Sequence, residues 1–467
     1  MERELLSTHD KALRINLEAT RYGTFAEIGA GQEVVRWFFN VGGASGTIAK
    51  SMSAYDMQVS DAIYGKCPRY VCRERLERML DYEHELNLKR LHQDRGEHTA
   101  FFSFANTVAT SGYKSTQEGH GWMGVRYQVR PGEEDSQILI HVRMTDRSSP
   151  RQQEALGIVG VNLLYGAFFL HQDPKALIES LCDNLTARRI QVDMIEFSGA
   201  EFRQVDNRLM SLKLVQAGLS DAAMFSATGQ VLQPSEAIYK RPLLIERGTF
   251  LPVRKVHLDL MNTAWAEFEK EVVDSPRPAL RLMEVTMRQL EASGGLEPQA
   301  FLNRADALMA CGYDVLISNY FEYYRLAAYL TRLSGQKLGL AMGIKSLQSL
   351  FNEQFYTHLE GGILESLGRL FKKDLKLYIY PTKDPVSGEI ESLDNVNIPR
   401  SQRKLFEYLV EKGDILPLRH YNPECLEEYS KDLLADIRQN NPRWENAVPE
   451  PVIQLIREKH LFGYQGH

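Results

Sequence analysis

The second half of the chain alternates between helix-like segments and short apolar runs that suit buried strands. This alternation restricts the fold more than any other feature of the sequence. Three helix–strand pairs follow one another, at 298–310 and 313–317, 321–333 and 337–341, and 363–371 and 375–380. Helices that alternate with strands are typical of a parallel sheet covered by helices. We therefore predict a parallel-sheet, Rossmann-like α/β domain over residues 278–400.

The preceding region has a less regular pattern. Strand-like runs at 24–28, 101–108, 124–129, 138–144 and 190–197 are separated by helix-like segments, among them 32–40, 47–62, 70–91 and 156–169. We interpret residues 22–255 as a mixed α+β domain. A helical lead-in over 1–21, a connection over 256–277 and a helical tail over 401–467 complete the predicted organisation of this α/β protein.

Length and composition fit a large globular protein. The chain has 467 residues, enough for two or three domains, and its net charge of -6 argues against a general nucleic-acid binder. The five cysteines are scattered and lack zinc-site spacing, so we predict neither a disulfide framework nor a metal site. The charged opening has no signal-peptide core and no apolar run is long enough to span a membrane. We expect a cytoplasmic protein without a membrane partner.

Glycines concentrate between residues 22 and 51. Gly29 and Gly31 follow the first strand-like run, and Gly43 and Gly46 lie in a second turn beyond a helix-like segment. Glycine lets backbone amides approach a ligand closely, so these four residues are candidates for binding a nucleotide or phosphate. The alternative interpretation is a pair of tight turns flanking a helix.

Two short motifs bear on this stretch. Residues 27–31, EIGAG, resemble the first motif of class I methyltransferases, which holds S-adenosylmethionine, and 314–319 are similar to the strand that carries their catalytic Asn-Pro-Pro-Tyr, without its prolines. Residues 44–51, ASGTIAKS, sit in a P-loop-like frame in which Ala44 and Ala49 replace the framing glycines. Lys50 is then either directed at a phosphate or a solvated lysine.

Polar residues follow the three strand-like runs of the predicted parallel sheet. In open α/β sheets, ligands bind outside the carboxyl ends of the strands, where helix N-termini add partial positive charge. The candidates for binding an anion there are Ser318, Asn319, Gly343, Lys345, Thr382 and Lys383, and Ser346 follows the second of the three runs as well. Helix caps need the same residue types, so capping residues and solvated lysines are the alternative.

His120 is the candidate for acid–base catalysis. It lies in the segment EGHGWMG, flanked by glycines and close to a tryptophan. An unperturbed histidine titrates near neutral pH, which suits proton transfer. The alternative is a loop histidine in a hairpin connection, because the sequence identifies no partner for it.

The opening ERELLSTHDKALRINLEATRYGTFAEIGAGQEVVRWFF and the later segment DNRLMSLKLVQAGL resemble a bacterial protein family of similar length that has no established activity. The resemblance covers the whole chain and transfers no site residue. Its members carry labels such as outer-membrane receptor and nicotinate-nucleotide adenylyltransferase. The residues support neither label, because a receptor barrel needs many amphipathic strands. The adenylyltransferases use paired histidines, and the chain has no His-x-x-His.

These patterns lead to two hypotheses. The first is an enzyme that binds a nucleotide or another phosphorylated small molecule, with no cofactor assigned. The second is a non-catalytic protein that senses a metabolite or docks a partner, including a second copy of itself. The segment NYFEYYRLAAYL favours the second, because helical spacing puts one set of residues on the same side: Tyr320, Tyr324, Ala327 and Ala328. Core packing is the alternative for that helix.

Overall fold

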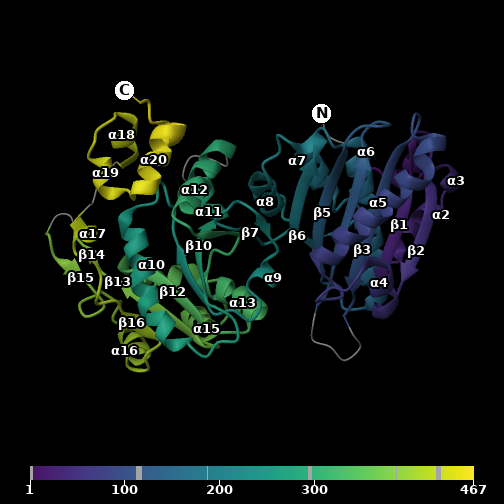
Figure 1. Ribbon diagram of the computed structural model, residues 1–467. Coiled ribbons are helices and arrows are strands. Elements are labelled where there is room, and N and C mark those ends of the chain that lie inside the picture. Colours follow the sequence, from purple (N-terminus) through teal and green to yellow (C-terminus); the bar gives the residue numbers. More distant parts are fainter. Residues whose placement is uncertain are drawn as a thin grey trace. The chain divides into compact units, whose positions relative to one another are not determined.

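A computed structural model describes residues 4–111, 118–186, 188–292, 297–384, 387–427 and 433–466. The chain divides into two compact units, Met1–Ala223 and Met224–His467 (Figure 1). The first contains a mixed six-stranded sheet and the second an eight-stranded sheet built around parallel strands. The predicted fold class, a mixed domain followed by a parallel Rossmann-like domain, is therefore confirmed.

The sheet of the first unit has the strand order β2-β1-β3-β4-β5-β6. Its strands are β1 (Arg21–Gly29), β2 (Ile48–Ala54), β3 (Ala100–Ala109), β4 (Gly119–Gln128), β5 (Asp135–Met144) and β6 (Ile190–Gly199). Strand β1 is parallel to both of its neighbours, whereas β3 to β6 form an antiparallel meander. The antiparallel half agrees with the predicted strand pair at 124–129 and 138–144.

Helices cover both faces of this sheet. They are α1 (Thr8–Asn16), α2 (Glu33–Phe39), α3 (Ala44–Thr47), α4 (Met57–Tyr64), α5 (Arg73–Arg95), α6 (Ser149–Phe169), α7 (Pro174–Ser180), α8 (Asn207–Gln216) and the short η1 (Ala200–Phe202). The charged helix α5 approaches one face, where Leu80 lies next to Gly124. The predicted apolar helix α6 is buried along most of its length in the main core on the other face.

One helix predicted in the first unit is wrong. Residues 47–62 were expected to form one helix, but they form strand β2, an aspartate cap and then α4. The Asp56 side chain accepts hydrogen bonds from the backbone N–H groups of Gln58 and Val59, which fixes the start of α4. Strand β2 forms because it pairs with β1, and such pairing overrides local helical spacing.

The sheet of the second unit has the order β16-β13-β12-β9-β10-β11-β7-β8. Its strands are β7 (Ala222–Phe225), β8 (Val231–Leu232), β9 (Leu243–Arg247), β10 (Leu280–Thr286), β11 (Asp314–Ser318), β12 (Leu338–Gly343), β13 (Leu375–Tyr380) and β16 (Ile415–Pro417). Six neighbouring strands of this sheet are parallel to one another, in the spatial order β11, β10, β9, β12, β13 and β16. Counted from β9 as the first, they follow the Rossmann order 3-2-1-4-5-6.

The connections of the second unit are mostly helical. They include α9 (Pro234–Ala237), α10 (Lys255–Phe268), η2 (Glu269–Glu271), α11 (Met287–Ala292), α12 (Pro298–Ala310), α13 (Tyr323–Ser334), α14 (Ile344–Leu350), η3 (Glu353–Tyr356), α15 (Gly362–Leu370) and α16 (Arg403–Glu411). The C-terminal part adds α17 (Glu424–Glu427), α18 (Leu433–Arg438), α19 (Trp444–Ala447), α20 (Glu450–Lys459) and η4 (Leu461–Gly463). Strands β14 (Thr382–Lys383) and β15 (Ile390–Glu391) form a separate hairpin. Within the described residues, no helix has the length and apolar character needed to cross a membrane.

The sheets place the change of unit earlier than the sequence analysis did. Strands β7 and β9, expected in the mixed domain over 22–255, belong to the second sheet. Strand β10 was not predicted, and the expected connection over 256–277 contains α10, which packs against β9 and β12. The short β9 and the charged β10 become strands because they pair with each other in the middle of the sheet.

Candidate ligand-binding site

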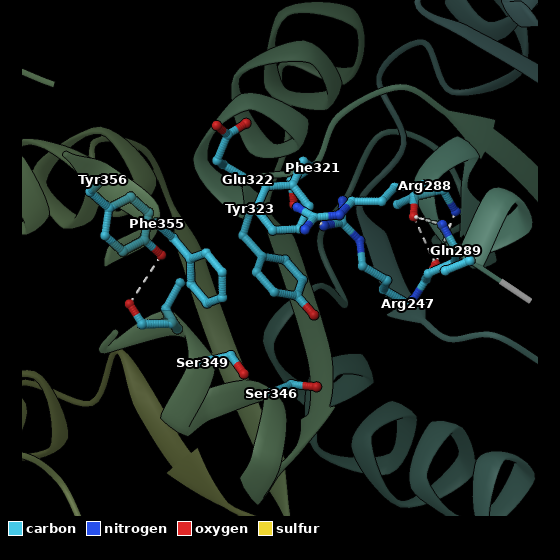
Figure 2. A pocket seen from close by; sticks show the side chains of 13 residues that line it. Arg247, Arg288, Gln289, Phe321, Glu322, Tyr323, Ser346, Ser349, Phe355 and Tyr356 are labelled. Atoms are coloured by element: carbon cyan, nitrogen blue, oxygen red, sulfur yellow. Dashed lines mark hydrogen bonds between the residues drawn. The ribbon is translucent and has the colours of Figure 1, made fainter. Parts of the chain in front are cut away.

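A cavity of about 350 Å³ opens at the carboxyl ends of the central parallel strands of the second unit (Figure 2). Arg247 ends β9, Thr286 ends β10, Tyr323 follows β11 and Ser346 follows β12, and all four line it. The Rossmann order reverses between β9 and β12, and ligands of open α/β sheets bind outside that point. The cavity therefore occupies the position where this class of fold binds nucleotides and related ligands.

Aromatic side chains form much of the cavity wall. The rings of Phe321 and Phe355 meet edge to face with 5.5 Å between their centroids. Tyr323 and Tyr356 also line the cavity, and Figure 2 shows the hydroxyl group of Tyr323 pointing toward Ser346. Burial raises the pKa of Tyr323, against the lowering effect of the Arg247 charge. A wall of flat rings with a few hydroxyl groups suits a planar ring that carries polar substituents.

A buried ion pair holds the strand ends in place behind this wall. The guanidinium of Arg247 donates to both carboxylate oxygens of Glu284, over 2.8 and 2.9 Å, and these side chains are 8% and 0% exposed. Arg247 also donates to the backbone oxygens of Tyr320 and Phe321 over 2.8 and 2.6 Å. Burial lowers the pKa of Arg247, but the Glu284 carboxylate outweighs that effect and raises it. Arg247 thus ties the ends of β9, β10 and β11 together.

The rim of the cavity carries charge of both signs. The guanidinium of Arg288 lies 4.1 Å from the centroid of the Phe321 ring, and the residue is exposed. Within the described part of the chain, Arg288 has no ion pair. Glu322, whose side chain is 10% exposed, lies 3.6 Å from the guanidinium of Arg325 and 3.6 Å from Nε2 of His358. Arg288 is therefore the cavity-lining cation best placed to meet a phosphate.

The six strand-end residues expected to bind an anion lie near this edge of the sheet but do not line the cavity. The Ser318 hydroxyl donates to Glu284 over 2.5 Å, and Asn319 is exposed. Gly343 precedes the first turn of α14 and Lys345 is exposed on that helix. Thr382 and Lys383 form β14. Strands β9 and β10 separate β11 from β12, so Ser318 and Gly343 do not lie on neighbouring strands.

The first glycine turn is filled by side chains of its own unit. The Glu27 carboxylate, which is 2% exposed, accepts from the Val34 backbone N–H of α2 and from the Asn106 amide, both over 3.1 Å. A Cβ on Gly29 would lie 2.2 Å from a backbone oxygen and one on Gly31 1.8 Å from the Asn106 side chain. The Glu27 carboxyl group therefore already occupies the N-terminus of α2, where an anion would otherwise bind.

The second glycine turn and the P-loop-like frame also have structural partners. Gly43 has a φ of 85°, a conformation that favours glycine, and both Gly43 and Gly46 are exposed. The Lys50 ammonium pairs with the buried carboxylate of Glu83, to which the hydroxyl of Tyr64 also donates over 2.8 Å. Lys50 is thus engaged by the side chains around it, and the alternative of a purely solvated lysine does not describe it.

His120 lies within β4 and not in a loop. Its Nδ1 is 3.3 Å from Nε2 of His141, and Nδ1 of His141 is 2.5 Å from a carboxylate oxygen of Asp193. The sequence identifies no partner for His120, because the two partners come from β5 and β6. His120 and the four glycines belong to the first unit, whereas the cavity belongs to the second.

Apart from Ser346, the residues that form the cavity were not predicted from the sequence, for one main reason. Strand β10 was not predicted, so Glu284, Thr286 and Arg288 had no assigned place. The pattern LRLMEVT alternates apolar and polar residues over part of its length, which is a strand signal that a period-two search would find. No sequence signal reveals that β9 and β12 are neighbours. That pairing brings the cavity-lining residues that follow β12 next to those that follow β10 and β11.

Comparisons with known proteins return only distant likenesses. No model of a protein family matches the chain. No curated protein matches it either. Among solved structures, the competence/damage inducible protein CihA from Agrobacterium tumefaciens matches 35% of this chain and 97% of its own, with 16% identity and a TM-score of 0.25.

Two further solved structures are similarly distant. A competence or damage-inducible protein from Enterobacter asburiae matches 36% of this chain and 99% of its own, with 12% identity and a TM-score of 0.26. The Plasmodium falciparum nicotinic acid mononucleotide adenylyltransferase complexed with APC matches 48% and 98%, with 9% identity and a TM-score of 0.31. At such values these likenesses transfer neither an activity nor a residue to this chain.

Proposed function

We propose that the second unit binds a nucleotide, or another phosphorylated small molecule with a planar ring, in the cavity at the strand ends. The supporting observation is the position of that cavity at the reversal of a 3-2-1-4-5-6 parallel sheet. The ring of the ligand lies against Phe321, Tyr323 and Phe355. The phosphate group meets Arg288 at the rim.

The aromatic wall and the rim cation favour this ligand class over others. A free sugar offers no flat face to rings that meet edge to face, and an apolar ligand leaves Arg288 unused. The volume of about 350 Å³ lies in the usual range of small-molecule pockets. Arg247 and Glu284 do not take part in binding, because each already satisfies the other.

Isothermal titration with adenosine 5′-monophosphate, adenosine and ribose 5-phosphate tests the proposal. Arg288→Ala should weaken binding of the monophosphate about tenfold and leave adenosine unaffected, because a charge-assisted contact is worth about 1.5–3 kcal/mol and this one is partly exposed. Phe355→Ala should weaken both ring-bearing ligands. Lys372→Ala removes an exposed cation of the same unit that does not line the cavity, and it should change nothing.

Two outcomes would count against the proposal. The first is that none of the three ligands, nor the monophosphates of the other bases, binds to the full chain. The second is that Lys372→Ala weakens binding as much as Arg288→Ala does, since the attraction would then be a general charge effect.

The proposal includes an enzymatic role, with a non-catalytic metabolite sensor as the second candidate. The sensor is favoured by one observation: among the described residues that line the cavity there is no histidine, and the buried Arg247 and Glu284 neutralise each other. Incubation of the bound nucleotide with the protein, followed by ³¹P NMR, separates the two. A changed phosphorus spectrum indicates turnover, and an unchanged spectrum with intact binding indicates a sensor.

A further inference from the structure

Three neighbouring strands of the first unit align an aspartate and two histidines. Asp193 lies on β6, His141 on β5 and His120 on β4, with 2.5 Å and 3.3 Å between their successive polar atoms. His141 is 1% exposed and Asp193 is 8% exposed, whereas His120 is only partly buried. The line therefore runs from a buried carboxylate to an imidazole that reaches the surface.

The chemistry of the three groups fixes the direction of their hydrogen bonds. An ionised carboxylate only accepts, so Nδ1 of His141 carries the hydrogen that Asp193 receives. In the neutral form of His141 the other ring nitrogen is an acceptor, and Nδ1 of His120 donates to it. Nε2 of His120 keeps a free lone pair as a result. The ring of Trp122 packs at 5.0 Å from the ring of His141 and holds it in this orientation.

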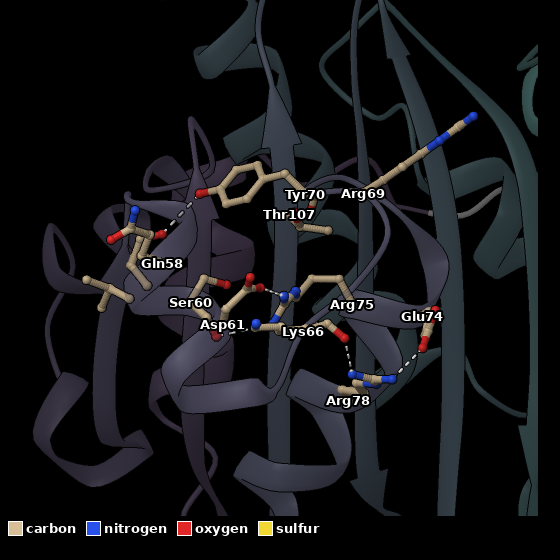
Figure 3. Close-up of polar contacts among 12 residues, drawn as sticks. Gln58, Ser60, Asp61, Lys66, Arg69, Tyr70, Glu74, Arg75, Arg78 and Thr107 are labelled. Carbon is tan, nitrogen blue, oxygen red and sulfur yellow. Dashed lines mark hydrogen bonds and ion pairs between the residues drawn. The ribbon is translucent and has the colours of Figure 1, made fainter.

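Charged groups around His120 come from several elements. Arg69 lies in the segment before α5, and Figure 3 shows its side chain extending away from Tyr70 and Arg75. Arg143 on β5 stands opposite His120 in the sheet and pairs with Glu118 over 2.9 Å. Burial, with smaller contributions from His141 and Arg69, lowers the pKa of His120 to about 4 against the raising effect of Asp193. His120 is accordingly unprotonated on one ring nitrogen at physiological pH.

We propose that this line is a proton-accepting site in which Nε2 of His120 is the general base, with a small anion bearing an acidic O–H group as its substrate. In the step, the O–H bond of the substrate breaks, its proton moves to Nε2 and its electron pair stays on oxygen. The charge of Arg69 stabilises the oxyanion. His141 and Asp193 are positioning residues, because they act only by setting the tautomer of His120.

Labelling with diethyl pyrocarbonate, which attacks unprotonated imidazole nitrogens, tests the tautomer in the full chain. Mass spectrometry of the peptides follows His120, and His9, whose side chain is 59% exposed, reports delivery of the reagent. Asp193→Asn turns the hydrogen bonds around, since an amide donates to His141. Labelling of His120 should then slow at least about tenfold, by the same logic that inactivates a triad whose aspartate becomes asparagine.

Asp135→Asn is the matched control. It removes a carboxylate that receives a hydrogen bond from another histidine, His84, over 2.9 Å, and it should leave His120 labelling unchanged. Circular dichroism establishes that both variants are folded. If either variant is not, long-range ¹⁵N NMR of the histidine rings in the unaltered protein decides the matter: Nε2 of His120 unprotonated supports the proposal, and Nε2 protonated overturns it.

Inorganic phosphate is the probe for the substrate class, because its monoanion combines an acidic O–H group with negative charge. Phosphate should protect His120 from the reagent more than chloride does at equal ionic strength, and Arg69→Gln should abolish the difference. Equal labelling in both salts overturns the assignment of an anionic substrate. Equal labelling of His120 in the wild type and in Asp193→Asn overturns the proposal that Asp193 and His141 set the tautomer of His120.

Discussion

Two junctions at the carboxyl ends of parallel strands differ in where a buried carboxylate points. At the end of β1, Glu27 accepts from the first turn of α2 and closes the junction. At the end of β10, Glu284 accepts from Arg247 on the neighbouring strand, and the space beyond the strand ends forms a cavity. The glycine-rich junction is the closed one. Local glycine content therefore does not decide whether a strand end can receive a ligand.

The difference follows from how each carboxylate is neutralised. Glu27 has only neutral donors, so burial raises its pKa to about 8 although the hydrogen bonds lower it. Glu284 is matched by a guanidinium that is itself buried. The Glu284 carboxylate is therefore held by Arg247 and not by the first turn of a helix.

The largest expected effect is the loss of the ion pair that keeps the second junction open. Arg247→Ala should lower the free energy of unfolding of the second unit by about 3–5 kcal/mol, because it leaves Glu284 buried without a counter-charge. Urea denaturation measures this. The double variant Arg247→Met with Glu284→Leu should lose less than the single one. A double variant as unstable as the single one would mean that the pair matters by its shape and not by its charge.

The next effect concerns the pH dependence of the closed junction. The folded pKa of Glu27 lies above its unfolded value of 4.5, so its stabilising contribution is complete at low pH and is lost as the pH rises toward about 8. Between these values, it should make the free energy of unfolding fall by about 1.4 kcal/mol per pH unit. Glu27→Gln should remove that slope from a series of urea titrations. Identical slopes in the two proteins would show that Glu27 is ionised in the fold.

The smallest effect compares one glycine from each junction. Gly31→Ala should destabilise the first unit by about 1–3 kcal/mol, because the new Cβ would lie 1.8 Å from the Asn106 side chain. Gly343→Ala should change stability by less than about 1 kcal/mol, since its φ is -80° and no atom lies within 4 Å of the new Cβ. Thermal unfolding checks both, and equal shifts would remove the contrast between the junctions.

The elements with strong local patterns were predictable, and those that depend on pairing were not. Helices α5 and α6 and strands β3 to β6 lie close to where the sequence placed them, although β4 begins five residues earlier, because each carries its own apolar periodicity. Strand β2 was predicted as helix, and β10 was not predicted at all. Both are stabilised by parallel neighbours that are distant in sequence.

The candidate sites show the same difference between what local sequence predicts and what distant contacts decide. His120 was chosen from its sequence context, but its partners His141 and Asp193 come from two other strands and only the sheet register places them next to it. The strand-end residues 318, 343 and 382 were expected to converge, and the strand order separates them. Ser346 does line the cavity, but Arg288 and Phe321, which also line it, follow strands on the other side of β9 and were not candidates.

The sequence by itself determined that this chain forms α/β units with a parallel sheet in its second half, because helix and strand periodicities are local properties. The tertiary structure alone decided which strand ends are neighbours. It also decided that buried Glu284 has a charged partner and that buried Glu27 has neutral donors. Those outcomes depend on contacts between residues that are far apart along the chain, and no local pattern records them. The open cavity of the second unit and the closed glycine turn of the first are both products of such contacts.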